Sequence, residues 1–214
     1  MVKQLLIVFT KNAQLGKVKT RLAATIGDDE ALQAHQLLVE KTAIQMRSTS
    51  CEKVVYYSDH IEDGDIFSTH GFHQYVQFGE DLGQRMQHAF SAEFTKGYTS
   101  IVMIGTDCPD LEKENVTEAF ELLKSNALVL GPAHDGGYYL IGLSSPREGL
   151  FSGIEWSTSS VFEKTLEIAK IAQMSVGILS TKRDIDTFDD LQSCDFGKEH
   201  FSHLLNQEYF SPIK

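Results

Sequence analysis

The sequence has few cysteines, few prolines and no long apolar segment. Its three cysteines among 214 residues lie far apart and form no CxxC pair, so neither a disulfide framework nor a cysteine zinc site is expected, and a cytoplasmic protein is indicated. The four prolines are scattered, and without a proline-rich linker we expect a single domain over residues 1–214. The apolar run at residues 5–9 is too short for a signal sequence or a membrane span.

Positive charge is also scarce, because 19 lysines and arginines accompany 30 aspartates and glutamates, for a formal net charge of −11. Phosphate groups repel a surface this acidic, so the composition argues against nucleic acid and anionic membranes as partners. Apolar residues make up 42% and charged residues 23%, which is typical of a globular protein. A cluster of basic residues in such a chain therefore calls for an explanation, whereas the oligomeric state is left open.

Short apolar runs alternate with helical patterns along the chain. The runs are residues 5–9, 54–57, 75–78, 101–104, 127–130, 138–143 and 176–179. Continuous aliphatic runs of this length suit strands that are buried on both faces. The helical patterns cover residues 28–46, 82–94, 114–123 and 160–172, and Ser160 with Glu163 predicts a capping box for the last of them. This alternation predicts an α/β fold, a three-layer α/β/α sandwich around a mixed, mostly parallel sheet.

Charged loops follow four of the predicted strands. The first is basic and has the sequence TKNAQLGKVKTRL, whereas the others are acidic and contain GTDCPDL, GPAHDGGYY and STKRDIDTFDDL. Ligands of open α/β sheets bind at the carboxyl ends of the strands, so we expect these loops to converge on one rim. Basic groups that face carboxylates suit an anionic ligand together with a divalent cation.

The basic loop predicts a phosphate site, because its cations come just before a helical stretch whose first amides can bind an anion. A P-loop is excluded, since Lys11 stands five residues before Gly16, where a Walker A motif has glycine. The alternative is a solvated basic loop with no ligand.

Two aspartates in the acidic loops are candidate metal ligands. Asp107 comes directly after an aliphatic strand, where a carboxylate is well placed for a hard cation. Asp186 lies in an Asp184-Ile-Asp186 pattern, which puts both carboxylates on one face of an extended segment. We interpret Asp110 as the N-cap of the next helix rather than as a ligand.

Each acidic loop also has a purely structural explanation. Asp184 could form a surface ion pair with its basic neighbours, and Asp186 or Thr187 could cap a helix that has Asp190 in its first turn. The Asp135-Gly136 step is a strong hairpin signal, although its glycines also suit a close approach of a ligand.

Taken together, these segments resemble the GT-A-fold nucleotide transferases. They are most similar to the glycosyltransferase-like or "rSAM/selenodomain-associated" transferase family, whose relatives include phospholactate guanylyltransferase and molybdenum cofactor guanylyltransferase. The matching segments occur in family order and spacing: GKVKTRL, GEDLGQRMQHAF, GTDCPDL, GPAHDGGYYLIGL, GIEWSTSSV and DIDTFDDL. The resemblance implies a seven-stranded mixed sheet with a nucleotide bound over its N-terminal half.

The resemblance also implies roles for individual residues. Lys19, Arg21 and Asp107 correspond to catalytic positions, and Asp107 and Asp186 to the ligands of Mg²⁺ or Mn²⁺. The nucleotide would contact Lys11, Gly16, Lys17, Lys19, Thr20 and Arg21 in the basic loop and Gly79, Leu82, Gly83 and Arg85 further along. The acceptor would contact Asp135, Gly136, Gly137, Trp156, Ser157 and Thr158. No lysine stands at residues 22–31, where sugar-phosphate nucleotidyltransferases have one, which disfavours a sugar-1-phosphate acceptor.

The expected function is therefore Mg²⁺-dependent transfer from a nucleotide donor to a small-molecule acceptor. We favour nucleotidyl transfer from a nucleoside triphosphate to a phosphorylated acceptor, with release of pyrophosphate, because the basic loop holds more cations than a diphosphate needs. The first alternative is a glycosyltransferase that uses a nucleotide-diphosphate sugar. The second is a non-catalytic nucleotide-sensing module, which we would expect to lack one of the metal carboxylates. The base and the acceptor are left open.

Overall fold

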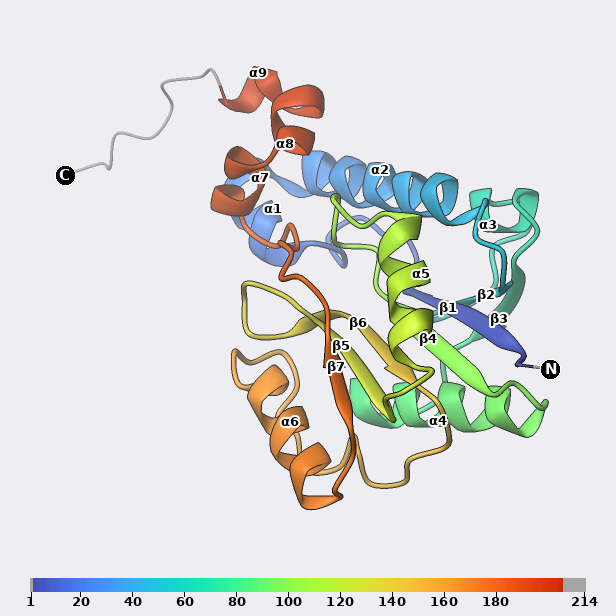
Figure 1. The fold of residues 1–214 in the computed structure, drawn as a ribbon. Coiled ribbons are helices and arrows are strands. Elements are labelled where there is room, and N and C mark those ends of the chain that lie inside the picture. The colour runs from blue at the N-terminus through green and yellow to red at the C-terminus, as the bar shows by residue number, and fades with distance from the viewer. Residues whose placement is uncertain (1, 206–214) are drawn as a thin grey trace.

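In the computed structural model, which describes residues 2–205, seven strands form one mixed sheet (Figure 1). The strands are β1 (Gln4–Thr10), β2 (Glu52–Tyr57), β3 (His73–Val76), β4 (Ser100–Ile104), β5 (Leu128–Pro132), β6 (Tyr138–Leu143) and β7 (Val176–Ile178). Their order is β3-β2-β1-β4-β6-β5-β7, and β6 runs antiparallel to both of its neighbours. The other six strands are parallel to one another, so their carboxyl ends share one edge of the sheet.

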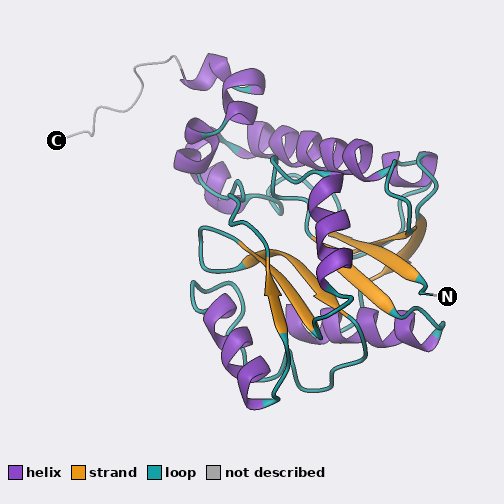
Figure 2. Cartoon of the chain, in the orientation of Figure 1, coloured by secondary structure: helices purple, strands orange, loops and turns teal. Residues whose placement is uncertain are grey.

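Helices cover both faces of the sheet, which makes the strands the middle layer (Figure 2). The described helices are α1 (Thr20–Ile26), α2 (Asp28–Met46), α3 (Ile66–Thr69), α4 (Leu82–Thr95), α5 (Lys113–Leu122), α6 (Val161–Ile171), α7 (Phe188–Ser193), α8 (Asp195–His200) and α9 (Ser202–Leu205). Side chains of α2, α3 and α5 pack on one face, and those of α4 and α6 on the other. The predicted three-layer α/β/α fold is therefore confirmed. None of these helices has both the length and the apolar character needed to cross a bilayer.

A third apolar cluster, outside the two sheet faces, fixes the segments that carry the charged loops. It joins Leu22 of α1 to Ile185, to Leu191 of α7 and to Phe196 and Phe201 of the α8 region, all of them buried. Burial of several large apolar side chains stabilises such a cluster by roughly 1.5–3 kcal/mol for each side chain. The basic loop and the last acidic loop are thereby held together by apolar packing.

Three local predictions are wrong. Ser160 does precede α6, but it has a helical backbone and its hydroxyl contacts Thr158 Oγ1 at 2.9 Å, so no capping box forms with Glu163. Asp110 does not cap α5, because the chain turns for two further residues and Glu112 is the N-cap, paired with Asn115 in a capping box. The third strand ends at Val76, two residues before the predicted end at Phe78.

Candidate active site

A cleft of about 1040 Å³ lies at the carboxyl edge of the sheet. Its walls come from the loops that follow β1, β3, β4 and β7, from the β5–β6 hairpin and from the loop between β6 and α6. The one basic and the three acidic loops recognised in the sequence all contribute to it. Because they extend from strands of a single sheet, the order of the strands alone brings them together.

The cleft includes most of the residues for which the sequence predicts a role. Those that line it are Lys11, Lys19, Thr20, Arg21, Leu82, Arg85, Asp107, Asp135, Gly137, Trp156, Ser157, Thr158 and Asp186. Those that lie outside its lining are Gly16, Lys17, Gly79, Gly83 and Gly136. Gly16 and Lys17 are exposed at the turn of the basic loop. Gly79 packs against the start of α4, and Gly83 and Gly136 pack against the loop between β6 and α6.

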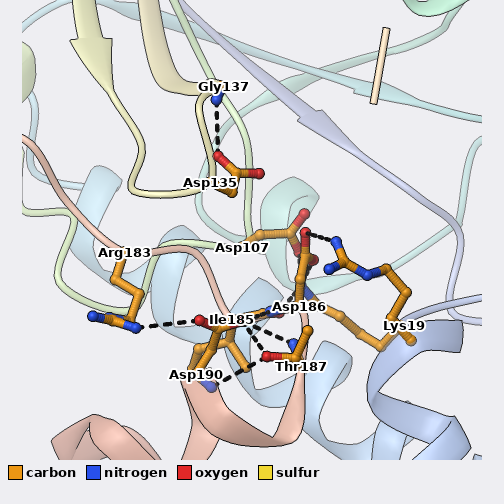
Figure 3. A network of polar contacts seen from close by, with 10 residues as sticks. Lys19, Asp107, Asp135, Gly137, Arg183, Ile185, Asp186, Thr187 and Asp190 are labelled. Carbon is orange, nitrogen blue, oxygen red and sulfur yellow. Dashed lines mark hydrogen bonds and ion pairs between the residues drawn. The ribbon is translucent and has the colours of Figure 1, made fainter. Parts of the chain in front are cut away.

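Lys19 lies at the centre of the polar contacts in this cleft (Figure 3). Its Nζ atom is 2.6 Å from Asp107 Oδ1 and 3.4 Å from Asp186 Oδ1, and it also donates a hydrogen bond to the Ile185 carbonyl. The Lys19 side chain is only 4% exposed, whereas the side chains of Asp107 and Asp186 are 45% and 37% exposed. We call these three charged residues the ion trio. It joins the loops after β1, β4 and β7.

The contact between Lys19 and Asp107 shifts the pKa values of both side chains. Burial opposes the charge on Lys19, but the negative charges of Asp107 and Asp186 outweigh it and hold the pKa of Lys19 above its ordinary value. Burial alone would raise the pKa of Asp107, yet the charge and hydrogen bond of Lys19 lower it below the ordinary value. Lys19 and Asp107 are therefore both charged at neutral pH.

The backbone holds Lys19 in an unusual conformation. Its φ and ψ of 48° and 40° lie in the left-handed region, which non-glycine residues enter at a cost of about 1–2 kcal/mol. Lys19 immediately precedes α1, and its carbonyl accepts a hydrogen bond from the Ala23 amide at 2.8 Å. The left-handed turn directs the lysine side chain inward, while α1 continues from the next residue.

Asn12 anchors the beginning of the basic loop. This buried side chain donates hydrogen bonds to the His60 carbonyl at 3.0 Å and to Glu62 Oε1 at 2.9 Å, and it accepts one from the Asp59 amide at 2.9 Å. The contacts fasten the loop after β1 to the loop after β2. Sequence reasoning gave Asn12 no role, because a single asparagine in a loop has no distinctive pattern.

The loop after β7 presents Asp186 through a helix cap. Thr187 is the N-cap of α7, and Asp190 Oδ2 accepts hydrogen bonds from the Asp186 and Thr187 amides at 3.3 and 2.9 Å. The Ile185 amide donates to the Asp107 carbonyl at 2.9 Å, which ties the two acidic loops together. The structural explanation for this loop therefore holds for Thr187 and Asp190, while the Asp186 carboxylate stays in the cleft.

The possibility that Asp184 forms a surface ion pair is wrong. Lys182 donates to the Asp110 carbonyl at 2.6 Å and Arg183 pairs with Asp190 at 3.4 Å, so both basic neighbours have other partners. Asp184 lines the cleft, and its Oδ1 atom is buried without a hydrogen-bond partner among the described residues. Burial and, secondly, the charge of Asp107 raise the pKa of Asp184 to about 8.

The raised pKa of Asp184 predicts a pH-dependent gain in stability for Asp184→Asn. A carboxyl whose pKa is higher in the folded state stabilises the fold fully below its unfolded pKa of about 4, and this contribution is lost as the pH rises through 8. The variant has no such loss, so its stability relative to the wild type should increase between pH 5 and pH 8.5 by on the order of 4 kcal/mol. Thermal unfolding across this range measures it.

Asp189→Asn, which changes an exposed carboxylate of the same segment, serves as the control and should follow the wild type at every pH. A constant difference between Asp184→Asn and the wild type over the whole pH range would contradict the prediction.

The segment after β3 forms another wall of the cleft. Arg85 Nε donates to the Gly79 carbonyl at 3.1 Å, which keeps the guanidinium over this turn. Gly79 has a φ of 141°, and a Cβ atom there would lie 2.8 Å from the Arg85 amide nitrogen. Trp156 lies against Gly83 of α4, where a Cβ atom would be 2.5 Å from the indole nitrogen. Trp156 thus reaches the cleft by packing over Gly83, a position of α4 that has no side chain.

The Gly136 turn belongs to a hairpin, as the sequence predicts. The Gly136 amide donates to the Ala133 carbonyl at 3.2 Å, and Asp135 Oδ1 accepts from the Gly137 amide at 2.9 Å. Gly136 has a φ of 89°, and a Cβ atom there would lie 2.0 Å from the Ser159 carbonyl oxygen. The hairpin therefore packs directly on the loop that contains Trp156.

His35 is a cleft residue that sequence reasoning did not recognise. It lies on α2 and is 3% exposed, and its Nε2 donates to the Lys11 carbonyl at 3.0 Å, since a carbonyl can only accept. Burial lowers its pKa below the ordinary value for histidine. The available signal was a polar residue on the apolar face of the predicted helix at residues 28–46.

Comparisons with known proteins agree with this architecture. Residues 41–158, more than half of the chain, match the family described as "Uncharacterized protein conserved in bacteria (DUF2064)". A crystal structure from Desulfovibrio desulfuricans G20, assigned as a nucleotide-diphospho-sugar transferase, is 32% identical with a TM-score of 0.85, over 94% of this chain and 90% of that chain. Among proteins of curated function, none is similar in sequence.

More distant structures share the fold. One is a cytidylyltransferase from Leptospira borgpetersenii serovar Hardjo-bovis, 16% identical with a TM-score of 0.56 over 90% of this chain and 84% of that chain. Another is Rv0371c from Mycobacterium tuberculosis H37Rv in complex with manganese, 13% identical with a TM-score of 0.52 over 88% and 96% of the two chains.

The resemblance to GT-A-like transferases is thus confirmed for the fold. The narrower kinship with the rSAM-associated transferases and the guanylyltransferases stays a prediction. The match over residues 41–158, more than half of the chain, shows that the chain belongs to the DUF2064 family.

Proposed function

We propose that the chain is a transferase that uses a nucleotide donor and Mg²⁺ or Mn²⁺, and that it transfers a nucleotidyl group from a nucleoside triphosphate to a phosphorylated small molecule. The observation that carries this proposal is the meeting of Asp107 and Asp186 on the buried Lys19 ammonium. Two carboxylates and a cluster of cations in one cleft provide complementary partners for a metal ion and for a chain of phosphates.

Asp107 and Asp186 fit a hard divalent cation. Their oxygen atoms converge on one positive charge, and the unpartnered buried oxygen of Asp184 lies in the same cleft. Among residues 2–205 no group of three or more His, Cys, Asp or Glu side chains is arranged to hold a metal ion. Mg²⁺ is usually held by one or two carboxylates together with substrate phosphates and several waters, so two carboxylates are enough. A bound cation would neutralise the phosphates and orient them for in-line displacement.

The cationic side chains of the cleft would bind the phosphates. Arg21 lines the cleft, and its side chain is 70% exposed. Its Nη1 atom lies 3.9 Å from Asp186 Oδ2, a long contact that leaves most of the guanidinium donors open to a ligand. Arg85 is held over the Gly79 turn, and Lys11 lies at the start of the basic loop. Donors fixed near the transferred group stabilise the negative charge that develops on the leaving pyrophosphate.

The number of cations favours a triphosphate over a diphosphate donor. Lys11, Lys19, Arg21 and Arg85 all line the same cleft. The remaining wall, with Asp135, Trp156 and Thr158, supports the acceptor assignment, because it belongs to loops on the β6 side of the sheet. A phosphate acceptor is ionised at neutral pH, so this reaction needs no general base.

Glycosyl transfer from a nucleotide-diphosphate sugar is the second candidate. It is favoured by the relative from Desulfovibrio desulfuricans, which is 32% identical and assigned as a nucleotide-diphospho-sugar transferase. The same carboxylates would hold the metal ion in that reaction. A non-catalytic nucleotide sensor is less well supported, since both carboxylates are present and face the cleft.

The leaving group distinguishes the two reactions. We expect pyrophosphate release from one of the four nucleoside triphosphates when Mg²⁺ and a pool of phosphorylated metabolites are present, and we expect EDTA to abolish it. Asp107→Asn should reduce the rate at least a hundredfold, or about 3 kcal/mol in barrier, because the metal loses a charged ligand. A coupled pyrophosphate assay measures this release.

The matched control is Asp110→Asn, which removes an exposed carboxylate three residues away that does not line the cleft. A parallel assay follows nucleoside diphosphate release from nucleotide sugars. EDTA-sensitive diphosphate release without pyrophosphate from any triphosphate would replace nucleotidyl transfer by glycosyl transfer as the function.

A further inference from the structure

The Lys19 ammonium is surrounded by oxygen atoms on its cleft side. Its three partners are a carboxylate oxygen of Asp107, a carboxylate oxygen of Asp186 and the carbonyl oxygen of Ile185. An ammonium has three N–H donors, so this set uses the full capacity of the group. Carboxylate and carbonyl oxygens are also the ligands that hard divalent cations select. The lysine nitrogen thus lies at the point where metal-type ligands converge.

An ammonium and a divalent cation cannot share this point. The Nζ atom lies 2.6 Å from Asp107 Oδ1, which is hydrogen-bonding distance. A second cation therefore cannot occupy the position beside Oδ1 that the ammonium fills. Two like charges that close would also repel each other strongly in a cleft where the lysine side chain is only 4% exposed. A metal ion can therefore bind these two Oδ1 atoms together only after Lys19 has moved.

From this geometry we propose that Lys19 and the divalent cation compete for Asp107 and Asp186, and that the donor's phosphates take over Lys19 when the metal binds. The second half rests on the proposed nucleotide-binding function, whereas the competition rests on the ion trio alone. Lys19 then acts as an internal counter-ion of the ligand-free protein. Metal affinity is low until phosphate oxygens offer the ammonium a new partner, so metal and nucleotide bind cooperatively.

The surroundings of Lys19 support such an exchange. Its backbone is held in the left-handed region, and the start of α1 is fixed by the buried Leu22, so movement is confined to the side chain. A lysine side chain has four rotatable bonds and can redirect its charge without a backbone change. Arg21 and Lys11, the other cations of the basic loop, line the cleft beside it. A phosphate bound by them would be within the reach of Lys19.

Competition predicts that removal of the Lys19 charge tightens metal binding. In Lys19→Met the two carboxylates have no internal partner, and we expect Mn²⁺ to bind at least tenfold more tightly than to the wild type, with no nucleotide present. The concentration of free Mn²⁺, read from its electron paramagnetic resonance signal, gives the affinity. Lys19→Gln is the second neutral variant, and Lys19→Arg, which keeps the charge, should remain as weak as the wild type.

Lys124→Met is the matched control. Lys124 also contacts a carboxylate oxygen at 2.6 Å, that of Glu121, but the pair is exposed and lies outside the cleft. This variant should bind Mn²⁺ as the wild type does. Adding Asp107→Asn to Lys19→Met should remove the gain, which would locate the tighter binding at the ion trio. The thermal stability of Lys19→Met should rise with Mn²⁺, which also reports that the variant is folded.

A measurement on the wild-type chain needs no variant. Reductive methylation followed by mass spectrometry reports how accessible each lysine amine is. We expect Mn²⁺ to increase methylation of Lys19 severalfold, while the exposed Lys124 is methylated equally with and without the metal.

The outcomes separate this inference from the proposed function. Mn²⁺ affinity that is unchanged or lower in Lys19→Met and Lys19→Gln, including no binding in any protein, overturns the competition, as does Lys19 methylation that Mn²⁺ leaves unchanged. Tighter Mn²⁺ binding by the variants in a chain that releases neither pyrophosphate nor diphosphate supports the competition and contradicts the function. Pyrophosphate release without any gain in Mn²⁺ affinity in the variants supports the function and contradicts the competition.

Discussion

Asp107→Asn and Asp186→Asn are each expected to abolish the thermal stabilisation that a nucleoside triphosphate with Mg²⁺ gives the wild-type chain. A ligand at 100 times its dissociation constant stabilises a protein by about 2.7 kcal/mol, and an amide cannot replace the charge of a carboxylate on a divalent cation. The ligand-free variants should remain folded, because the apolar cluster around Leu22 and Ile185 holds the same loops. Thermal unfolding with each triphosphate, with and without Mg²⁺, provides the test.

Asp110→Asn again serves as the control and should keep the full stabilisation, since this exposed side chain lies outside the cleft lining. Retention of the Mg²⁺-dependent shift by both Asp107→Asn and Asp186→Asn would show that the metal assignment is wrong. Loss in only one variant would restrict the assignment to that carboxylate.

Gly136→Ala is expected to destabilise the fold by about 4 kcal/mol or more. The new Cβ atom would lie 2.0 Å from the Ser159 carbonyl oxygen, and the φ of 89° is itself unfavourable for alanine. Backbone atoms on both sides must move, so the hairpin would separate from the loop that carries Trp156. Urea unfolding measures the loss of stability, and nucleotide binding should weaken in parallel.

Gly97→Ala separates the two causes of that loss. Gly97 has nearly the same φ, 91°, but nothing lies within 4 Å of its added Cβ atom. It should therefore cost only the conformational part, about 1 kcal/mol. Equal losses for the two variants would mean that the contact between Gly136 and Ser159 is unimportant for stability.

The sequence predicts the regular elements well where burial follows a simple period. The helical pattern at residues 28–46 matches α2, and the apolar run at residues 138–143 matches β6. The third strand is misplaced by two residues because Phe78, which ends the apolar run, has a side chain that is 70% exposed at the sheet edge. An apolar run shows which residues are hydrophobic, but an edge position is decided by the order of strands.

Local signals predict a helix after the basic loop and a helix cap at Thr187, but not how short these helices are or that α8 exists. Helices α1, α7 and α8 have only six or seven residues, which is too short for a helix to be stable alone. They depend on the cluster that contains Leu22, Phe196 and Phe201. That cluster joins segments about 170 residues apart, and such pairings leave no periodic trace in the sequence.

The location of the candidate site was predictable, but its internal contacts were not. Asp107 and Asp186 follow strands whose ends meet at one edge, which a parallel sheet implies. The burial of Lys19 between them depends on a left-handed turn that residue type does not suggest. The alternative of a surface ion pair for Asp184 is wrong for a related reason, since its basic neighbours Lys182 and Arg183 turn toward Asp110 and Asp190.

The long loop that Lys19 closes has a consequence for protein synthesis. Its partners Ile185 and Asp186 lie 166 and 167 residues further along the chain. The ribosome makes Lys19 early and these two partners late, so until translation is nearly complete only Asp107 is available to pair with the lysine. Strands β1, β2 and β4 can pair before that point, whereas the cleft is completed only when the last acidic loop emerges. Incomplete chains that end before residue 185 therefore lack the ion trio even if most of the sheet has formed.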